Sequence, residues 1–138
     1  MSVIYVAMAV STGSGRDGHV ETSDGKVSLD LAIPKELGGS GAGSNPEQLV
    51  AMGYAACFSD ALSAAAQRWK VELKGVEVAC SVSLHRSGDG FSLSFDIVAQ
   101  LPHVAPEAAD SLVAEAHASC PYSRAFMHGA PTRVRAET

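Results

Sequence analysis

A run of small side chains between residues 45 and 69 limits the possible folds of this 138-residue chain more than any other feature. Asn45 suits the cap of a helix, Pro46 its first position, and Gln48 stands where a capping-box partner belongs. Apolar residues then recur at helical spacing to about Trp69. The small residues among them are Ala51, Gly53, Ala55, Ala56, Ala61, Ala64, Ala65 and Ala66. Because small side chains let other segments approach closely, the sequence predicts a buried central helix.

The residues before this helix predict strands. Val3 to Met8 form a nearly continuous apolar run that is typical of a covered strand. The glycine-rich stretch 12–18 then predicts a turn that projects Arg16, and Asp24-Gly25 is a strong hairpin signal. The glycine-rich connector 38–43 is too flexible to form a packed element, so strands and connector together account for residues 1–44.

The second half predicts a hairpin followed by a helix. Within 75–101, apolar residues alternate on both sides of a Ser-Gly-Asp-Gly turn, which is the pattern of two paired strands. Residues 106–119 predict a helix that Pro121 ends and that leads to Cys120, and 132–136 could form a short last strand. We therefore expect one α+β domain over 1–138, with antiparallel sheets and two main helices.

Composition narrows the function classes. Ten Lys and Arg face 15 Asp and Glu, for a net charge of −5, and no basic run exists, so neither nucleic acid nor an anionic membrane is an expected partner. The longest uninterrupted stretch of apolar or small residues, 49–58, is too short to span a bilayer. Three cysteines, an odd number, fit free thiols in a reducing compartment, so we expect a cytoplasmic protein.

The three cysteines have different settings. Cys80 alternates with apolar strand residues and is expected to be a small buried hydrophobe. Cys57 lies mid-helix, where a core role and a chemical role both remain open and where the helix dipole does not act. Cys120 stands at a helix end before proline, where a thiol can be exposed, which favours a chemical role.

Two other interpretations of the cysteines are weaker. The tetrapeptide that begins at Cys120, Cys-Pro-Tyr-Ser, resembles the redox turn of glutaredoxins, but it lies 18 residues from the C-terminus rather than after the first strands. Cys57, His117, Cys120 and His128 could supply metal ligands, but their spacing matches no standard zinc pattern. We therefore expect no bound metal and no bound cofactor.

Four blocks of sequence resemble the organic hydroperoxide resistance branch of the OsmC/Ohr family. They are Asn45-Pro46-Glu47-Gln48-Leu49, Gly53-Tyr54-Ala55-Ala56-Cys57-Phe58, Ala116-His117 and Cys120-Pro121-Tyr122-Ser123. N-terminal segments such as Gly15-Arg16-Asp17-Gly18 resemble the same group. The sequence departs from the family pattern directly after Ser123, where it continues Arg-Ala-Phe-Met-His-Gly.

This resemblance implies a fold, an activity and a set of site residues. The implied fold is the α+β fold of the family in an intertwined homodimer. The implied activity is a peroxidase that reduces organic hydroperoxides and is itself reduced by dihydrolipoyl groups on lipoylated proteins. Cys57 would be the peroxidatic cysteine and Cys120 the resolving one, linked as a disulfide after turnover, while Arg16 and Glu47 match the family's charged pair.

The chemistry explains why a cation is expected near Cys57. The thiolate is the nucleophile, and lowering a cysteine pKa from about 8.5 to about 6 takes roughly 3.4 kcal/mol. An arginine is always charged and presents several donors, so Arg16 is the candidate, with Glu47 orienting it through a bidentate pair. Ten residues of helix, about 15 Å, separate Glu47 from Cys57, so Arg16 must bridge them or a partner subunit must supply a charge.

The apolar neighbours of Cys57 suggest its substrate. Tyr54, Phe58, Met52 and Phe126 could form a pocket that prefers alkyl or lipid hydroperoxides. Glu47 at the second helical position could also serve only to complement the helix dipole. The competing function is a non-catalytic protein of the same fold that binds apolar ligands or serves in stress.

Overall fold

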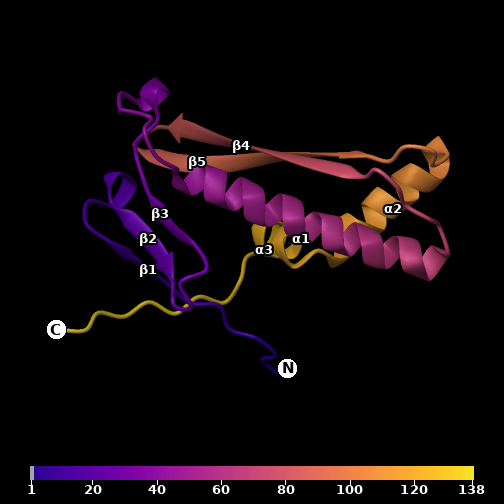
Figure 1. The fold of residues 1–138 in the computed structure, drawn as a ribbon, viewed down its shortest axis with the longest axis horizontal. Helices are drawn as coiled ribbons and strands as arrows, with labels where there is room; N and C mark the ends of the chain where they lie inside the picture. Colours follow the sequence, from indigo (N-terminus) through magenta and orange to yellow (C-terminus); the bar gives the residue numbers. More distant parts are fainter. Residues whose placement is uncertain (1) are drawn as a thin grey trace. The chain divides into compact units, whose positions relative to one another are not determined.

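The computed structural model describes residues 2–138. Its internal contacts gather in two units, the first ending at Leu49 and the second beginning at Val50, and each unit is described by itself. The elements of both units are drawn in Figure 1. The prediction of one domain over 1–138 stays a prediction.

The first unit holds a three-stranded antiparallel sheet in the order β1-β2-β3. Its strands are β1 (Ala9–Thr12), β2 (His19–Thr22) and β3 (Ser28–Asp30). The Asp24-Gly25 hairpin signal is confirmed: β2 and β3 pair on either side of it, and Gly25 takes a φ of +72°, which glycine adopts without strain.

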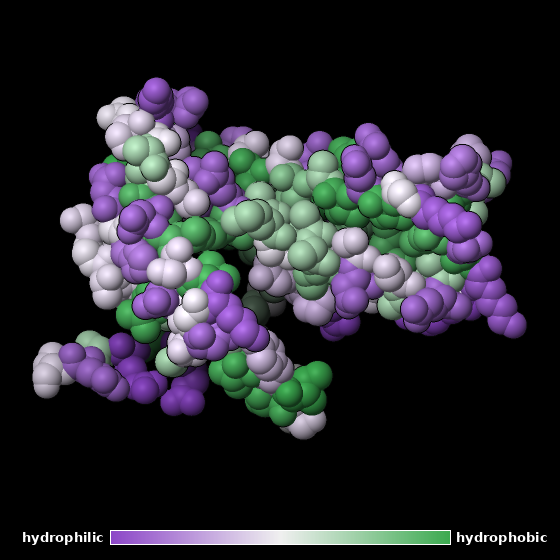
Figure 2. Space-filling view, viewed as in Figure 1, coloured by the Kyte–Doolittle hydropathy of each residue, from purple (hydrophilic) through white to green (hydrophobic). Residues whose placement is uncertain are grey.

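The expected strand over Val3–Met8 is wrong for this chain. Residues 2–8 form no strand, and Val3 and Ile4 are 81% and 95% exposed. Hydrophobic side chains show along this N-terminal segment in Figure 2. The expected strand over 132–136 is also absent. An extended segment becomes a strand only where a neighbour pairs with its backbone, and within 2–138 neither segment has such a ladder.

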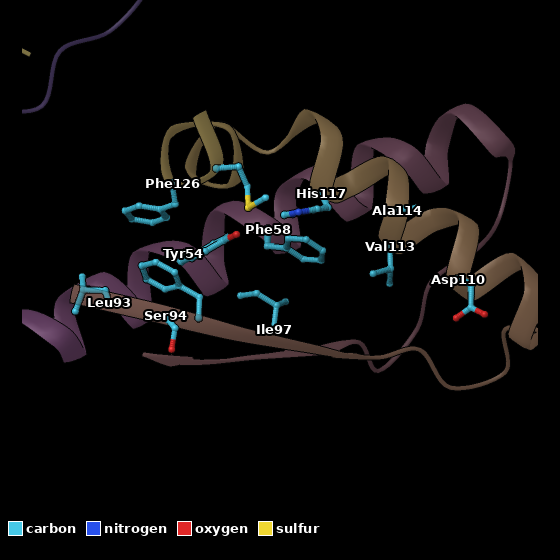
Figure 3. A pocket seen from close by; sticks show the side chains of 12 residues that line it. Tyr54, Phe58, Leu93, Ser94, Ile97, Asp110, Val113, Ala114, His117 and Phe126 are labelled. Carbon is cyan, nitrogen blue, oxygen red and sulfur yellow. The ribbon is translucent and has the colours of Figure 1, made fainter. Parts of the chain in front are cut away.

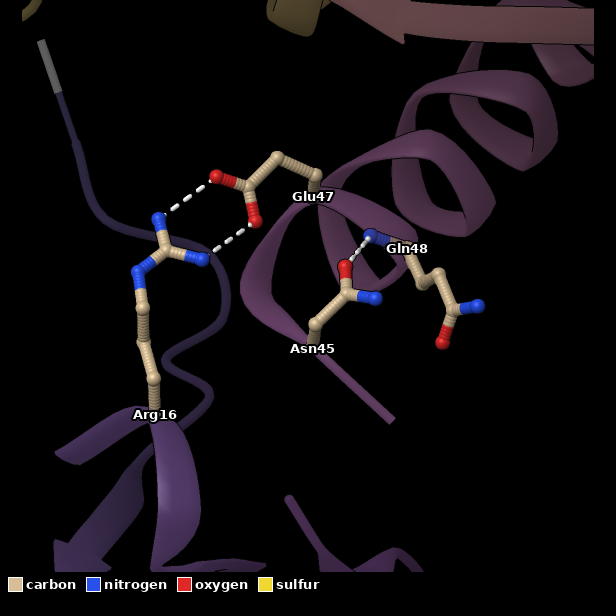
Figure 4. A network of polar contacts seen from close by, with 4 residues as sticks. All are labelled: Arg16, Asn45, Glu47 and Gln48. Carbon is tan, nitrogen blue, oxygen red and sulfur yellow. Dashed lines mark hydrogen bonds and ion pairs between the residues drawn. The ribbon is translucent and has the colours of Figure 1, made fainter. Parts of the chain in front are cut away.

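Helix α1 (Pro46–Trp69) forms over the range that the small-residue run predicts. Asn45 caps it as expected, because its Oδ1 accepts a hydrogen bond from the backbone N–H of Gln48 at 2.9 Å (Figure 4). By length and mean hydropathy alone, an 18-residue window of α1 could cross a membrane. Phe58 and Leu62 are instead fully buried in the protein core, so we interpret α1 as a core helix.

The predicted hairpin is confirmed as β4 (Glu77–Ser87) and β5 (Gly90–Gln100). Their antiparallel register pairs Cys80 with Ile97 and Val82 with Phe95, so the alternating apolar residues share one face. That face packs against the buried cluster formed by α1 and the following helix.

The second long helix, α2 (Pro106–Ser119), begins and ends where the sequence predicts. A third helix, α3 (Pro121–His128), was not expected. Pro121 occupies its first turn, where a missing N–H costs nothing, so this proline starts a helix as well as ending one. Figure 1 shows α1 lying along the β4–β5 hairpin in the second unit. Leu112 and Ala116 of α2 complete its core.

Candidate active site

Two of the predicted site residues face each other across helices of the second unit. Cys57 lies in the middle of α1 and is half-buried, while Cys120 stands between α2 and α3 and is fully buried. The Cys120 thiol points at the sulfur of Cys57, with 3.5 Å between the two sulfur atoms. Both thiols are free, so the structure is that of a reduced pair one short movement away from a disulfide.

The surroundings of Cys57 raise the pKa of its thiol. Burial is the largest cause, because a desolvated anion is disfavoured. The adjacent sulfur of Cys120 and the carboxylate of Asp60 add to the rise, since neighbouring groups of like charge resist ionising together. Within residues 50–138, the groups that act on this thiol therefore favour its protonated form.

One group acts in the opposite direction. The backbone N–H of Tyr122 bonds to the Cys57 sulfur and lowers its pKa, although by less than burial raises it. Tyr122 lies in the first turn of α3, where backbone N–H groups lack partners within the helix. Gly53, one turn before Cys57, leaves room for the Tyr122 ring, because a Cβ there would lie 2.8 Å from the phenol oxygen. The sequence analysis missed this donor because it did not predict α3.

The other two predicted residues form an ion pair in the first unit. Arg16 lies in a short 3-10 turn between β1 and β2, and Glu47 lies in the first turn of α1. Two parallel hydrogen bonds of 2.8 and 2.5 Å join the guanidinium to the carboxylate (Figure 4). Arg16 holds the pKa of Glu47 below its ordinary value. The structure thus contains the expected bidentate pair, while its service to Cys57 stays a prediction.

Cys80 takes no part in this arrangement. It is half-buried on β4, and its side chain packs against the core, close to the expected role of a small hydrophobe. Burial, with a smaller contribution from Asp96, raises the pKa of its thiol. Cys80 is therefore the natural internal control for the chemistry of the other two cysteines.

A cavity of about 620 Å³ opens beside the helix core. Figure 3 shows Tyr54, Phe58 and Phe126 among its lining side chains, with Asp110 of α2 at the far end. The further lining residues are Leu93, Ser94, Phe95, Ile97, Val113, Ala114, His117 and Met127. Three of the four expected pocket residues therefore line one cavity. Met52 does not, since its side chain is 57% exposed, and neither Cys57 nor Cys120 belongs to the lining.

A polar cluster in the first unit does not amount to a site, and no metal site is found among the described residues. His19 stands between Ser28 and Asp30, with hydrogen bonds of 3.0 and 2.9 Å, in the order of a Ser-His-Asp triad. The Asp30 side chain is 92% exposed, so water competes for it and the cluster serves the sheet surface. Among residues 2–138, no three His, Cys, Asp or Glu side chains converge as metal ligands would, so His117 and His128 do not join the cysteines.

Comparison with known proteins now assigns the family. The model of the OsmC-like protein family matches residues 38–135. The chain belongs to the OsmC-like family. The organic hydroperoxide resistance protein of Xanthomonas axonopodis pv. citri is 42% identical over 125 residues, covering 89% of this chain and 87% of the relative. The organic hydroperoxide resistance protein OhrB of Bacillus subtilis is 37% identical, covering 88% and 90%.

Solved structures agree with this assignment. An organic hydroperoxide resistance protein of Legionella pneumophila superposes with a TM-score of 0.88 at 44% identity, covering 93% of each chain. One from Vibrio cholerae, described with captopril bound in one of its active sites, gives 0.86 at 45% identity, covering 93% and 88%. The chain is thus an OsmC-like protein of the organic hydroperoxide resistance branch, and the predicted α+β family fold is confirmed.

Proposed function

We propose that this OsmC-like protein is a thiol peroxidase that reduces alkyl or lipid hydroperoxides to alcohols. The observation that carries the proposal is the 3.5 Å separation between the sulfurs of Cys57 and Cys120. At this distance, the Cys120 thiol can react with a sulfenic acid on Cys57 before that sulfur is oxidised further. Membership in a branch whose relatives are named for organic hydroperoxide resistance supports the substrate class.

The proposed reaction has three steps. The Cys57 thiolate attacks the terminal oxygen of the hydroperoxide, the O–O bond breaks, and the alkoxide takes a proton to leave as an alcohol. The sulfenic acid left on Cys57 then reacts with the Cys120 thiol, forming the disulfide and releasing water. A dithiol finally reduces this disulfide by two successive exchanges and becomes a disulfide itself.

Arg16 supplies the positive charge in this proposal. The groups of the second unit raise the pKa of Cys57, so attack at neutral pH requires a cation that they do not provide. Arg16, held by Glu47, would stabilise the thiolate and the departing alkoxide. It comes either from the same chain or from a partner subunit.

Dihydrolipoyl groups on lipoylated proteins are the proposed reductant, and the cytoplasm is the proposed compartment. A dihydrolipoyl group carries two thiols on one short chain, so its second thiol can release the mixed disulfide without a further collision. A reducing compartment suits a protein with three free cysteines.

We propose an intertwined homodimer as the working state. The N-terminal segment exposes Val3, Ile4, Tyr5 and Val6 at 81%, 95%, 79% and 74%. A run of exposed apolar residues with unpaired backbone is costly in water and is a ready template for pairing with another chain. We expect this segment to pair with the second copy, and light scattering on the full chain and on a chain that begins at Met8 tests it.

The test of the peroxidase uses cysteine variants. Hydroperoxide consumption is measured with dihydrolipoamide for the wild type, Cys57→Ser, Cys120→Ser and the control Cys80→Ser. We expect Cys57→Ser to lose turnover, and Cys120→Ser to consume about one equivalent and then stop. Cys80→Ser should match the wild type, and mass spectrometry should find only a Cys57–Cys120 link. Equal rates for the wild type and Cys57→Ser would refute the peroxidase.

One observation favours a second candidate, a non-catalytic protein that binds apolar ligands or serves in stress. The 620 Å³ cavity is lined mainly by apolar side chains and includes neither cysteine. This alternative predicts that an apolar fluorescent probe binds with equal affinity to the wild type and to Cys57→Ser, while neither protein consumes hydroperoxide.

A further inference from the structure

A hydrogen-bonded network joins the three helices of the second unit, with Tyr54 and Ser123 buried and His117 at its exposed end. The Oγ of Ser123 on α3 lies 2.7 Å from the phenol oxygen of Tyr54 on α1 and 2.9 Å from Nδ1 of His117 on α2. A serine hydroxyl has one hydrogen and two lone pairs, so Ser123 can donate to at most one partner and accepts from at least one. Both bonds form only while α1, α2 and α3 hold this one arrangement.

Burial makes the arrangement strict. Ser123 is fully buried and Tyr54 is 3% exposed, so water cannot replace a lost partner at the serine. Any rotation or slide of α3 that separates these atoms would leave the hydroxyl unpaired inside the core, which is costly. The hydrogen-bonded network therefore fixes the position of α3 more precisely than apolar contacts could, because apolar contacts are non-directional and tolerate small sliding movements.

This anchor stands one turn from the resolving sulfur. Cys120 is the N-terminal cap of α3, and Ser123 follows it by three residues. The Cys120 side chain makes no capping hydrogen bond of its own. A helix of eight residues does not hold its shape or place by itself, so external contacts decide where Cys120 points.

We propose that Tyr54, Ser123 and His117 are positioning residues that keep the Cys120 sulfur within reach of Cys57. The proposal rests on the disulfide chemistry of the proposed function. In that chemistry, these residues would speed the reaction of the Cys57 sulfenic acid with the Cys120 thiol. Misplacement of a reacting group by about 1 Å can slow a reaction by about a hundredfold. Nothing in the order of residues along the chain indicates this role.

Other contacts keep α3 docked when the Tyr54–Ser123–His117 network is disrupted. Phe126 stacks on Phe95 with 4.4 Å between ring centroids, and the Tyr122 ring covers Gly53. Removing the Ser123 hydroxyl should therefore loosen α3 without detaching it. This separation of docking from precise placement makes the proposal testable in a folded protein.

The test measures how strongly the fold favours the disulfide. Each protein is equilibrated with mixtures of reduced and oxidised glutathione, so that two thiols and one oxidised glutathione exchange for the protein disulfide and two reduced glutathiones. The equilibrium constant of this exchange gives the effective concentration of the Cys120 thiol at Cys57. We expect Ser123→Ala to lower it at least tenfold. Ser119→Ala is the matched control, because that hydroxyl bonds only carbonyls of its own helix, and it should leave the value unchanged.

Two further variants keep the test decisive if Ser123→Ala unfolds. Tyr54→Phe removes one bond and keeps the ring, and it should also lower the effective concentration. His117→Asn keeps a polar atom near the position of Nδ1 and should stay close to the wild type, whereas His117→Leu should not. A folded Ser123→Ala or Tyr54→Phe protein with an unchanged value would overturn the positioning role.

The glutathione measurement also separates this inference from the peroxidase proposal. It requires no hydroperoxide, so absent turnover in the wild type would refute the peroxidase while a tenfold loss in Ser123→Ala still supported the positioning role. Conversely, normal turnover with an unchanged effective concentration in Ser123→Ala would refute only the positioning role.

Discussion

Replacing Arg16 with alanine should greatly reduce the fraction of Cys57 that is thiolate at neutral pH. Burial and the neighbouring Cys120 sulfur raise the pKa of this thiol, and only the Tyr122 N–H opposes them within the second unit. Without a cation, the pKa of Cys57 should therefore stay above that of an ordinary cysteine. A working nucleophile with a pKa of about 6 needs roughly 3.4 kcal/mol from elsewhere, and Arg16 is the proposed source.

The size of the effect follows from these values. At pH 7, about 90% of a thiol with a pKa of 6 is ionised, against about 3% at 8.5, a thirty-fold difference. A less basic thiolate is also intrinsically less nucleophilic, so the rate constant changes by less than the thiolate fraction. Titration of the thiol is therefore a sharper measurement than the rate.

The assay follows the ultraviolet absorbance of the thiolate against pH. A Cys80→Ser/Cys120→Ser background leaves Cys57 as the only cysteine to titrate. Arg16→Ala should raise the Cys57 pKa by more than one unit. Arg86→Ala is the control, because this substitution removes the same charge from a different place. Arg86 lies on β4, with its guanidinium 5.4 Å from the centroid of the Phe91 ring. An unchanged titration in Arg16→Ala would remove this guanidinium from the mechanism.

Three other outcomes test the fold and the ion pair. Leu62→Ala, at a fully buried position, should lower the free energy of unfolding by about 3–5 kcal/mol in a urea titration. Because Arg16 depresses the pKa of Glu47, the stability advantage of the wild type over Glu47→Gln should be full above about pH 4.5 and fade as the pH falls through the depressed value, as acid-dependent urea titrations would show. Gly39→Ala should lower the thermal midpoint, because the new Cβ would collide with the backbone carbonyl of Ile33, and an unchanged midpoint would contradict this.

The elements that local chemistry specifies could be predicted from the sequence. Helix α2 begins at Pro106 because a proline at the first position costs no hydrogen bond, and the β4–β5 register follows the alternation of apolar residues. Helix α3 was missed because Pro121 was interpreted only as a terminator, although the same proline suits a helix start. The N-terminal strand was wrong because a strand depends on a neighbour that sequence pattern does not show.

The candidate site divides in the same way. The family resemblance pointed to Cys57 and Cys120, and the structure brings their sulfurs together. The hydrogen bond between Tyr54 and Ser123 joins residues 69 positions apart, so no local sequence pattern could predict it. Contacts of this kind arise from the packing of helices, and they became visible only with the three-dimensional structure.

The positions of the two sulfurs in the chain also link oxidation to thermodynamic stability. A disulfide between two cysteines 63 positions apart would close a loop that contains the β4–β5 hairpin and all of α2. Closing such a loop removes enough freedom from the unfolded chain to favour the native state by about 4 kcal/mol. Oxidation of the two cysteines to a disulfide would thus leave the protein more resistant to unfolding than its reduced form.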